Sequence, residues 1–363
     1  MARFTDLFLD VTKDGHKIPK ENYLPQGKYP IIDQGQEYIA GYSDEAEGLY
    51  EDVPAIIFGD HTRIIKYVDK PCFLGADGVK LLKAKDSSSN YKYLYYALCH
   101  AKIPNTGYNR HFKWLKEVDI RLPNKHEQQN VVGVLDKLTD LISLRKQQLA
   151  KLDELVKARF VEMFGDEKQF TSMPLSESVE EMFIGPFGSS LKNDCFVSKE
   201  DAFCMVYEQK HAIRKTMDVE TRYVGQKKYN ELKRFIVMGG DIIVSCRGTI
   251  GEIYVLPDNA PFGIMHPSIM KIRLKESVYN KSYFVFALEQ SMKKHNGEAN
   301  GSGVKMAVTA TTLGKERFAI PPMPSQQQFA NFVVRTNRQK LTIQQSLDKL
   351  EVLRKSLMQE YFG

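Results

Sequence analysis

Residues 345–363 read QSLDKLEVLRKSLMQEYFG, and residues 147–165 read QQLAKLDELVKARFVEMFG. Nine of these nineteen positions are identical at a constant offset of 198 residues. Unrelated helices would match at roughly one or two such positions, so the repeat is genuine. The same offset continues upstream, where it pairs Pro123 with Pro321. The repeated unit is therefore about half of the chain, which is longer than the roughly 20 to 50 residue period of a solenoid.

The repeated stretches predict two long amphipathic helices. From residue 125 to residue 164, apolar side chains recur at spacings of three and four, and Asn124 can cap the start. Such a helix would be about 60 Å long. The second helix is predicted to begin at Ser325, with Gln328 completing a capping box. Each apolar stripe is one helix wide, so each helix needs one partner, and the other copy can supply it. The predicted packing residues are Leu135, Leu138, Ile142, Leu149, Leu152, Leu347, Leu350 and Leu353.

The segments outside the helices have a different pattern. Short apolar runs broken by Gly, Pro and Asp predict strands and turns, and each half then continues into a short aromatic helix. We therefore predict four parts: a first head at residues 1–122, a helix at 123–165, a second head at 166–320 and a helix at 321–363. The fold class is α+β, with two mixed α/β heads.

The composition is that of a folded protein with two ordinary cores. The chain has 363 residues, of which 42% are hydrophobic and 26% charged, and its formal net charge of +6 permits a polyanionic partner. Its five cysteines contain no C-x-x-C pair, which argues against a disulfide framework or a zinc site. No apolar run approaches the roughly 18 residues of a membrane span, so we expect a cytoplasmic protein that contacts no membrane.

Motifs for catalysis are missing from the sequence. We find neither a phosphate-binding glycine loop nor a DNA methyltransferase motif, and we predict no cofactor and no metal. The alternative is a free-standing metal-dependent nuclease, because Asp194, Glu208 and Lys210 have the order of carboxylates that hold a divalent ion and a lysine that steadies phosphate charge. A methyltransferase with an unrecognised site and a scaffold that binds no DNA also remain open.

Basic and hydrogen-bonding side chains gather on predicted loops between the strands. Arginine can read guanine by a two-pronged hydrogen bond, asparagine can read adenine, and lysine mainly holds phosphates. The predicted DNA-binding residues of the first head are His61, Thr62, Arg63, Lys66, Tyr108, Asn109, Arg110, His111 and Lys113. Those of the second head are Lys228, Arg234, Arg247, Thr249 and Lys305.

Two segments carry a family resemblance that extends over the whole chain. Residues 120–142 read IRLPNKHEQQNVVGVLDKLTDLI and residues 318–334 read FAIPPMPSQQQFANFVV; each has an apolar strand, prolines and a glutamine pair that opens a long helix. With the duplicated helix endings in Phe-Gly, they resemble the specificity (S) subunits of type I restriction-modification enzymes. The resemblance implies that each head is a target-recognition domain for one half of a split DNA site. It also implies that the two helices pack antiparallel as a coiled-coil spacer, with pseudo-twofold symmetry.

The same resemblance implies the partners. These are double-stranded DNA, two methyltransferase (M) subunits and restriction/translocase (R) subunits, which supply ATP-driven translocation and cleavage. The chain itself would then be no enzyme but the non-catalytic subunit of the complex. On this interpretation, the missing catalytic motifs are expected.

Overall fold

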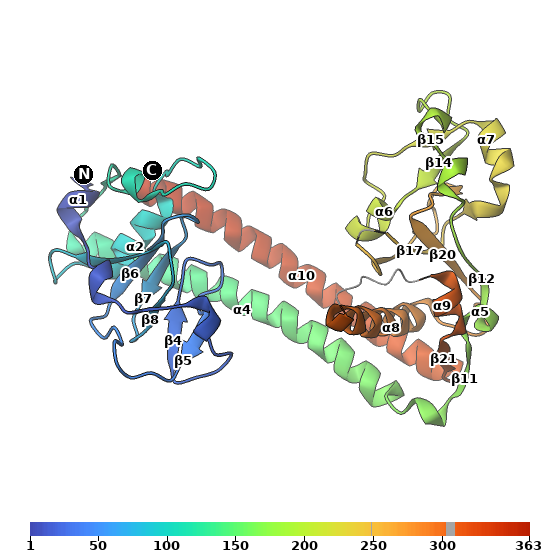
Figure 1. Cartoon of the computed structure of the whole chain (residues 1–363), viewed down its shortest axis with the longest axis horizontal. Coiled ribbons are helices and arrows are strands. Elements are labelled where there is room, and N and C mark those ends of the chain that lie inside the picture. Colours follow the sequence, from blue (N-terminus) through green and yellow to red (C-terminus); the bar gives the residue numbers. More distant parts are fainter. Residues whose placement is uncertain (248, 303–308) are drawn as a thin grey trace. The chain divides into compact units, whose positions relative to one another are not determined.

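A computed structural model describes residues 1–247, 249–302 and 309–363 of the chain. It divides into two compact units. Unit 1 comprises Met1–Leu149 together with Thr342–Gly363, and unit 2 comprises Ala150–Leu341. Unit 2 is therefore continuous in sequence, whereas unit 1 is assembled from two separate stretches. Each long helix contributes one part to each unit (Figure 1).

Unit 1 is built on two four-stranded sheets, with strand orders β2-β9-β6-β7 and β3-β8-β4-β5, and a short β1-β10 ladder. The strands are β1 (Ala2–Arg3), β2 (Phe8–Asp10), β3 (Lys17–Ile18), β4 (Tyr29–Ile32), β5 (Gly41–Ser43), β6 (Ala55–Gly59), β7 (Ile65–Val68), β8 (Phe73–Gly75), β9 (Val79–Ala84) and β10 (Asp119–Ile120). The helices of this head are α1 (Phe4–Leu7), α2 (Tyr91–His100) and α3 (Phe112–Leu115).

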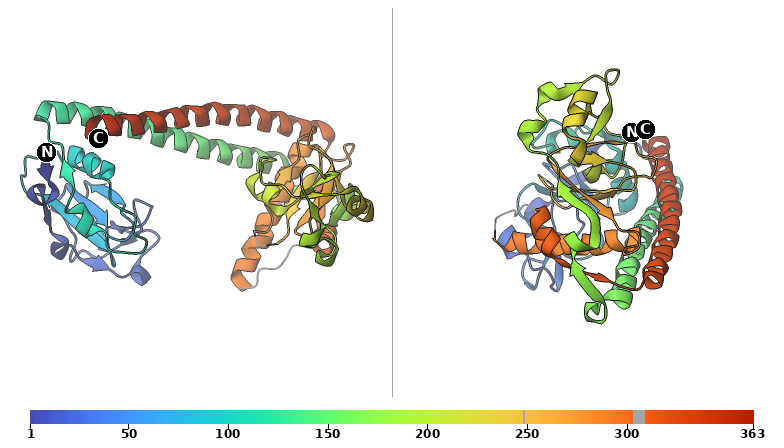
Figure 2. Two further views of the ribbon diagram at one scale, coloured as in Figure 1. Left: turned by 90° about the horizontal axis from the view of Figure 1, so that it is seen from above. Right: turned by 90° about the vertical axis from the view of Figure 1, so that its right-hand side faces the viewer.

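The central strand β6 of unit 1 is buried on both faces. Ile56 and Phe58 pack on one face with the α2 residue Leu94, whereas Ile57 packs on the other face with Leu74 of the second sheet. This alternation follows from the two-residue period of a strand. The opposite side of α2 packs against α4 and α10. The helix α2 therefore lies between this sheet and the long helices (Figure 2).

Unit 2 repeats this plan. Its sheets have strand orders β12-β20-β17-β18 and β13-β15-β14-β19-β16, and β11 pairs with β21. The strands are β11 (Thr171–Pro174), β12 (Val179–Ile184), β13 (Phe196–Val197), β14 (Cys204–Tyr207), β15 (Tyr223–Val224), β16 (Ile236–Val237), β17 (Ile242–Ser245), β18 (Ile253–Val255), β19 (Gly263–Met265), β20 (Ile269–Leu274) and β21 (Arg317–Ile320). The helices are α5 (Leu175–Ser178), α6 (Gln209–Arg214), α7 (Gln226–Glu231), α8 (Lys281–Ser302) and α9 (Ala310–Lys315).

The strand registers of the two units correspond. In unit 1, Ile57 of β6 lies opposite Leu81 of β9. In unit 2, Ile243 of β17 lies opposite Lys271 of β20. The main sheets of the two heads therefore share one strand order and register, although the sequences show little of this likeness. The predicted α+β class, with two mixed α/β regions, is confirmed.

The first long helix, α4 (Lys125–Phe164), has the bounds that its apolar pattern predicts. The Asn124 side chain accepts a hydrogen bond from the Glu127 backbone N–H at 2.9 Å and so caps the helix. The second long helix, α10 (Met323–Phe362), begins before the predicted start, so the capping role of Ser325 was wrong. The reason is Pro324, which is tolerated in the first turn because the missing N–H would have no partner there.

In unit 1, the early part of α4 and the late part of α10 pack together along one seam. Leu138, Ile142 and Leu347 are buried in a shared cluster, and Leu149 and Leu350 are partly buried beside it. The remaining predicted packing residues differ in their environment. Leu135 is fully buried against α2, Leu152 is half-buried, and Leu353 is 47% exposed. The packing role of Leu353 was therefore wrong, because its spacing places it on the stripe next to the seam.

In unit 2, the late part of α4 and the early part of α10 pack on the head. Phe160 and Phe329 have their ring centroids 5.5 Å apart within the largest buried cluster of the unit. Among the described residues, no helix combines the length and the apolarity that crossing a lipid bilayer requires. The four-part division into residues 1–122, 123–165, 166–320 and 321–363 stays a prediction.

Candidate nucleic-acid interface

Several loops of unit 1 meet at one end of its main sheet. Strand β6 ends at Gly59, which lies opposite the first residue of β9, Val79. Beyond this point, the Asp60 backbone N–H donates to the Gly78 carbonyl at 2.6 Å. The loop after β6 carries the predicted residues His61, Thr62 and Arg63, and it is thus fixed to the end of the sheet.

A second loop, distant in sequence, joins the same end. The His111 backbone N–H donates to the Asp60 carbonyl at 2.7 Å. The Tyr108 ring stacks on the His61 ring, with centroids 4.6 Å apart and planes at 7°. Tyr108 is 87% exposed, and Arg110 is also exposed. The structure therefore brings two of the predicted loops into one surface, which we call the unit 1 edge (residues 34, 60–64, 77–78 and 108–111).

Gln34 organises the unit 1 edge and was missed by the sequence prediction. Its side-chain oxygen accepts from the His61 N–H at 3.1 Å, and its carbonyl accepts from the Thr62 hydroxyl at 2.7 Å. Its amide nitrogen donates to the Asp77 carbonyl at 3.2 Å. A single glutamine after a buried strand gives no local signal of these contacts, because all three partners come from other turns.

Two predicted DNA-binding residues of unit 1 are buried, and their prediction was wrong. The Lys66 side chain is 4% exposed, and its ammonium lies 3.6 Å from Asp33. Burial lowers the pKa of Lys66, and the Asp33 charge opposes this change. His111 has no exposed surface, and its Nδ1 lies 3.0 Å from the Asp60 carbonyl. Both residues therefore lie inside the fold, where the Lys66 ammonium has Asp33 as its partner and the Nδ1 of His111 has the Asp60 carbonyl.

Three other predicted residues of unit 1 are on the surface but already engaged. The Arg63 guanidinium donates to the Ile103 carbonyl at 3.2 Å. The Asn109 amide donates to the Thr106 carbonyl. The Lys113 ammonium lies 4.2 Å from the centre of the Trp114 ring. Arg110 and Tyr108 are therefore the side chains of this edge best placed to meet a ligand.

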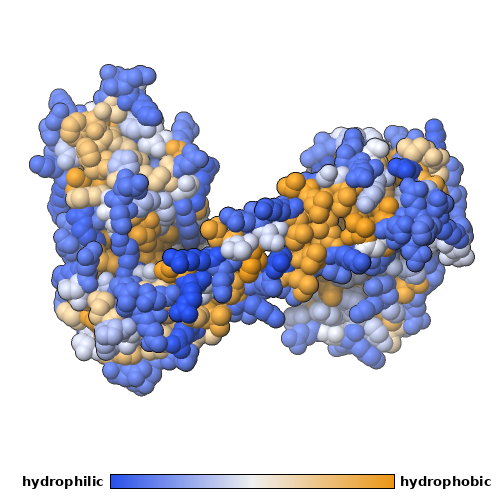
Figure 3. Space-filling view, turned by 180° about the vertical axis from the view of Figure 1, so that it is seen from behind, coloured by the Kyte–Doolittle hydropathy of each residue, from blue (hydrophilic) through white to orange (hydrophobic). Residues whose placement is uncertain are grey.

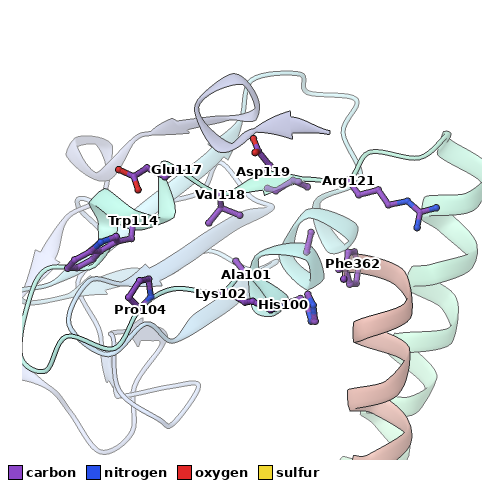
Figure 4. A pocket seen from close by; sticks show the side chains of 13 residues that line it. His100, Ala101, Lys102, Pro104, Trp114, Glu117, Val118, Asp119, Arg121 and Phe362 are labelled. Atoms are coloured by element: carbon purple, nitrogen blue, oxygen red, sulfur yellow. The ribbon is translucent and has the colours of Figure 1, made fainter.

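A cavity of about 440 Å³ lies elsewhere in unit 1, at the end of α10 (Figure 4). Trp114 and Pro104 line one side, and Phe362 lines the other. Its charged lining residues are Lys102, Arg121, Glu117 and Asp119. This balance of charges does not favour a phosphate, and the cavity contains none of the predicted DNA-binding residues.

Unit 2 has a corresponding end of its main sheet. Ser245, the last residue of β17, lies opposite Ile269, the first residue of β20. The Cys246 N–H donates to the Ser268 carbonyl at 2.8 Å, which repeats the contact between Asp60 and Gly78. Arg247 and Thr249 follow on the next loop and are exposed. We call this surface the unit 2 edge (residues 185–187, 246–247, 249 and 266–268).

His266 lies within the unit 2 edge. Its backbone N–H donates to the Tyr207 carbonyl at 2.8 Å, and its Nδ1 lies 2.7 Å from the Ser268 hydroxyl. Burial lowers the pKa of His266; Glu208 opposes this shift, and the positive charges of Arg222 and Arg247 add to it. The lowered pKa favours the neutral form of the ring, which can both accept and donate a hydrogen bond.

Two other predicted residues of the second head, Lys228 and Arg234, are not on this edge. Lys228 lies on α7, where its ammonium pairs with Glu231. Arg234 lies on the short helix Lys233–Phe235 that leads into β16. Lys305 lies outside the described residues. The sequence prediction therefore combined residues that the structure assigns to two different parts of unit 2.

Two of the three residues of the nuclease alternative, Glu208 and Lys210, are engaged in structural contacts, and Asp194 is exposed on the short helix Asn193–Cys195. Glu208 caps α6, and its carboxylate pairs with Arg222 and, at 2.9 Å, with Lys210. Burial raises the pKa of Glu208, but the hydrogen bonds from Arg222 and Lys210 outweigh it, so the net shift is downward. Within the part of the chain that the structure describes, no three His, Cys, Asp or Glu side chains stand together as a metal site. The nuclease alternative has no support here.

The long helices carry a hydrophobic surface outside their shared seam. In unit 1, this surface appears in orange in Figure 3 over the paired helices. The large apolar side chains of these helix parts that are 42% to 67% accessible are Val134, Leu141, Leu144, Val352 and Leu353. Exposed apolar side chains in this number indicate that another protein binds these helix parts.

Comparisons with known proteins agree with one another. Residues 3–154 and 177–352 match the family model of the type I restriction modification DNA specificity domain. The chain is 28% identical over 151 residues to the specificity subunit of the type I restriction enzyme EcoR124I/EcoR124II of Escherichia coli, an alignment that spans 36% of the chain and 37% of that subunit. It is 22% identical over 349 residues to the putative type I restriction enzyme MjaX specificity subunit of Methanocaldococcus jannaschii, covering 88% and 79% of the two chains.

Solved structures show the same fold. The S subunit of a type I restriction-modification system from M. genitalium aligns with a TM-score of 0.56 at 17% identity, over 99% of the chain and 95% of its own. A chain from a study of complex assembly and conformational transition in the type I system aligns with a TM-score of 0.56 at 14% identity, with the same coverage.

Proposed function

The chain belongs to the family of type I restriction modification DNA specificity domains, and we propose that it selects the DNA target of a type I complex by reading a two-part site. The observation that carries the proposal is the pair of corresponding edges. Each unit presents loops at the corresponding end of its own main sheet, yet the exposed side chains on these loops differ. They are Tyr108 and Arg110 in unit 1, and Arg247 and Thr249 in unit 2. Two corresponding sheets that carry different loop side chains suit the recognition of two different DNA sequences.

In this proposal, unit 1 reads one half-site and unit 2 reads the other. An arginine at each edge can bond a guanine in two places, and the hydroxyl groups can bond either kind of base. The chain contributes recognition and no catalytic residue. Cleavage and methylation belong to its partners.

The partners we propose are double-stranded DNA, methyltransferase (M) subunits and restriction/translocase (R) subunits. The number of M subunits is two, because the helix repeat offers two similar exposed positions. Leu155 is 48% exposed and Leu353, its counterpart in the repeat, is 47% exposed. Two like surfaces of one chain suit two copies of the same partner. The cytoplasm, where cellular DNA is found, is the proposed location.

The test is an exchange of recognition regions. Residues 166–320 are replaced by the corresponding region of a relative with a known target, and the methylated motif is read by sequencing DNA from cells that also express the M subunits. We expect one half-site to change and the other to stay. The reciprocal exchange of residues 1–122 is the control and should change the other half. A change of both half-sites by either exchange would refute the assignment.

A further inference from the structure

Phe187 is the most unusual side chain of the unit 2 edge. It is 86% exposed, although a phenylalanine ring gains about 2 kcal/mol when it is buried. We propose that Phe187 is a specificity-determining residue whose ring contacts the methyl group of a thymine in the half-site that unit 2 reads. This inference rests on the proposed function and adds a base and a residue to it.

The sheet places Phe187 among the other loops of the edge. Strand β12 ends at Ile184, which lies opposite Met270 of β20. The next residue, Gly185, donates its N–H to the Ile269 carbonyl at 3.0 Å. The chain therefore leaves the sheet at the same end as the segment with Arg247 and Thr249, which follows β17 on the other side of β20. A ligand bound at this end would meet all three loops.

The backbone under Phe187 is fixed. Pro186 is buried. A Cβ atom on Gly185 would come within 2.3 Å of the His266 carbonyl oxygen, so this close approach requires glycine. On the other side, the Ser190 N–H donates to the Phe187 carbonyl at 2.9 Å and closes a short turn. A ring projected from a fixed backbone loses little conformational freedom on binding.

The chemistry of the ring selects the ligand group. Phenylalanine has no hydrogen-bond donor or acceptor, so it cannot read the polar edges of the bases. In the major groove, the C5 methyl group of thymine is the apolar group that distinguishes one base pair from another. Tyr108 of unit 1 is equally exposed, but its hydroxyl can also form hydrogen bonds, so it carries no such restriction.

The test uses the assembled methyltransferase complex and duplexes that contain the natural site. Each thymine of the unit 2 half-site is replaced in turn by uracil, which lacks the methyl group alone. For the wild type, we expect one position at which uracil weakens binding by about 4-fold, the value of burying one methyl group. The variant Phe187→Ala should bind the natural site more weakly and should make no difference between thymine and uracil at that position. Phe187→Leu should restore part of the difference.

Two controls define the result. Phe262→Ala removes another exposed ring of unit 2, 44% accessible, and should keep the uracil effect. Discrimination at the unit 1 half-site should be unchanged in every variant, which also shows that the complex is folded.

Four outcomes would overturn the inference while leaving the proposed function in place. These are an unaltered uracil effect in Phe187→Ala, a loss that is equal for all sequences, a half-site without thymine, and a fluorescence increase of 2-aminopurine beside Phe187, which would show insertion between base pairs. A wild-type complex without any preference for its site would instead refute the proposed function itself.

Discussion

Unit 1 and unit 2 attach the long helices to their heads through the same contacts. Each unit has a tyrosine whose hydroxyl donates to a backbone carbonyl in the segment before a long helix. Each also has a glutamine whose amide donates to the carbonyl of a proline, and a phenylalanine at a helix end beside that tyrosine. In unit 1 these are Tyr93 to Arg121 at 2.9 Å, Gln128 to Pro123 at 2.8 Å and Phe362, 5.3 Å from the Tyr93 ring. In unit 2 they are Tyr283 to Ala319 at 3.1 Å, Gln326 to Pro321 at 2.8 Å and Phe164, 4.8 Å from the Tyr283 ring.

The two units differ in the size of the cavity beside each attachment and in one buried residue of the main sheet. The cavity beside Phe362 has a volume of about 440 Å³, whereas the corresponding cavity beside Phe164 has about 70 Å³. Leu81 of unit 1 is replaced by the buried Lys271 in unit 2. The attachment contacts are thus kept, and the packing around them has diverged.

The largest difference we predict concerns the terminal phenylalanines. Phe164 is 2% exposed and packs among aromatic rings, so Phe164→Ala should lower the free energy of unfolding of unit 2 by about 3 to 5 kcal/mol. Phe362 is only partly buried, so Phe362→Ala should cost unit 1 clearly less. Denaturant unfolding followed by circular dichroism measures both. Equal losses would show that the larger cavity of unit 1 does not weaken its attachment.

A smaller effect is expected at Lys271. Its side chain has no exposed surface and its ammonium bonds Glu181 and the Ile236 carbonyl. Lys271→Ala should destabilise unit 2 by about 2 to 3 kcal/mol. This loss is smaller than the loss expected on breaking a fully buried ion pair, because Glu181 is 38% exposed. Lys271→Leu, which introduces the residue found in unit 1, should cost less because it refills the space. Thermal unfolding of the two variants decides this, and a greater loss for leucine than for alanine would contradict the comparison.

The recognition edges should respond independently. Arg110→Ala should weaken discrimination at the unit 1 half-site by about 1 to 3 kcal/mol if the arginine contacts a base edge, and Arg247→Ala should do the same at the unit 2 half-site. Contact with phosphate alone would instead lower affinity for every sequence and reduce the salt slope by about one unit. Binding assays of the assembled complex at several salt concentrations separate these cases. A variant that alters the half-site of the other unit would break the modular interpretation.

The smallest effect is expected at Lys210. Lys210→Ala should change the activation free energy of DNA cleavage by the assembled enzyme by no more than about 0.5 kcal/mol, as for an ordinary surface substitution. Glu208 keeps its ion pair with Arg222, so the fold of unit 2 should also be retained. Loss of cleavage with normal DNA binding would revive the nuclease alternative.

The sequence predicts the long helices well, because their evidence is local and periodic. The bounds of α4 follow from spacing and from the Asn124 cap, both of which lie within the helix itself. The start of α10 was misplaced because Ser325 and Gln328 imitate a capping box, whereas Pro322 and Pro324 give the better signal.

The candidate site is only partly visible in the sequence. Lys66 and His111 have the residue types of a DNA-binding loop, yet their burial depends on Asp33 and Asp60, which no local pattern connects to them. Phe187 was missed because exposed and buried phenylalanines look alike in a sequence. Such residues are distinguished by which strands end at the same place, and this depends on the topology of the whole sheet.

The discontinuity of unit 1 has a consequence for biosynthesis. Residues 1–149 emerge from the ribosome first, but unit 1 also requires residues 342–363. Unit 2 can therefore complete its fold earlier than unit 1. Until residue 347 and its neighbours emerge, Leu138 and Ile142 lack the helix that buries them. A nascent chain of this protein therefore exposes this apolar face of α4 throughout the synthesis of unit 2. Early binding of a chaperone or of a partner subunit would shield that face from aggregation.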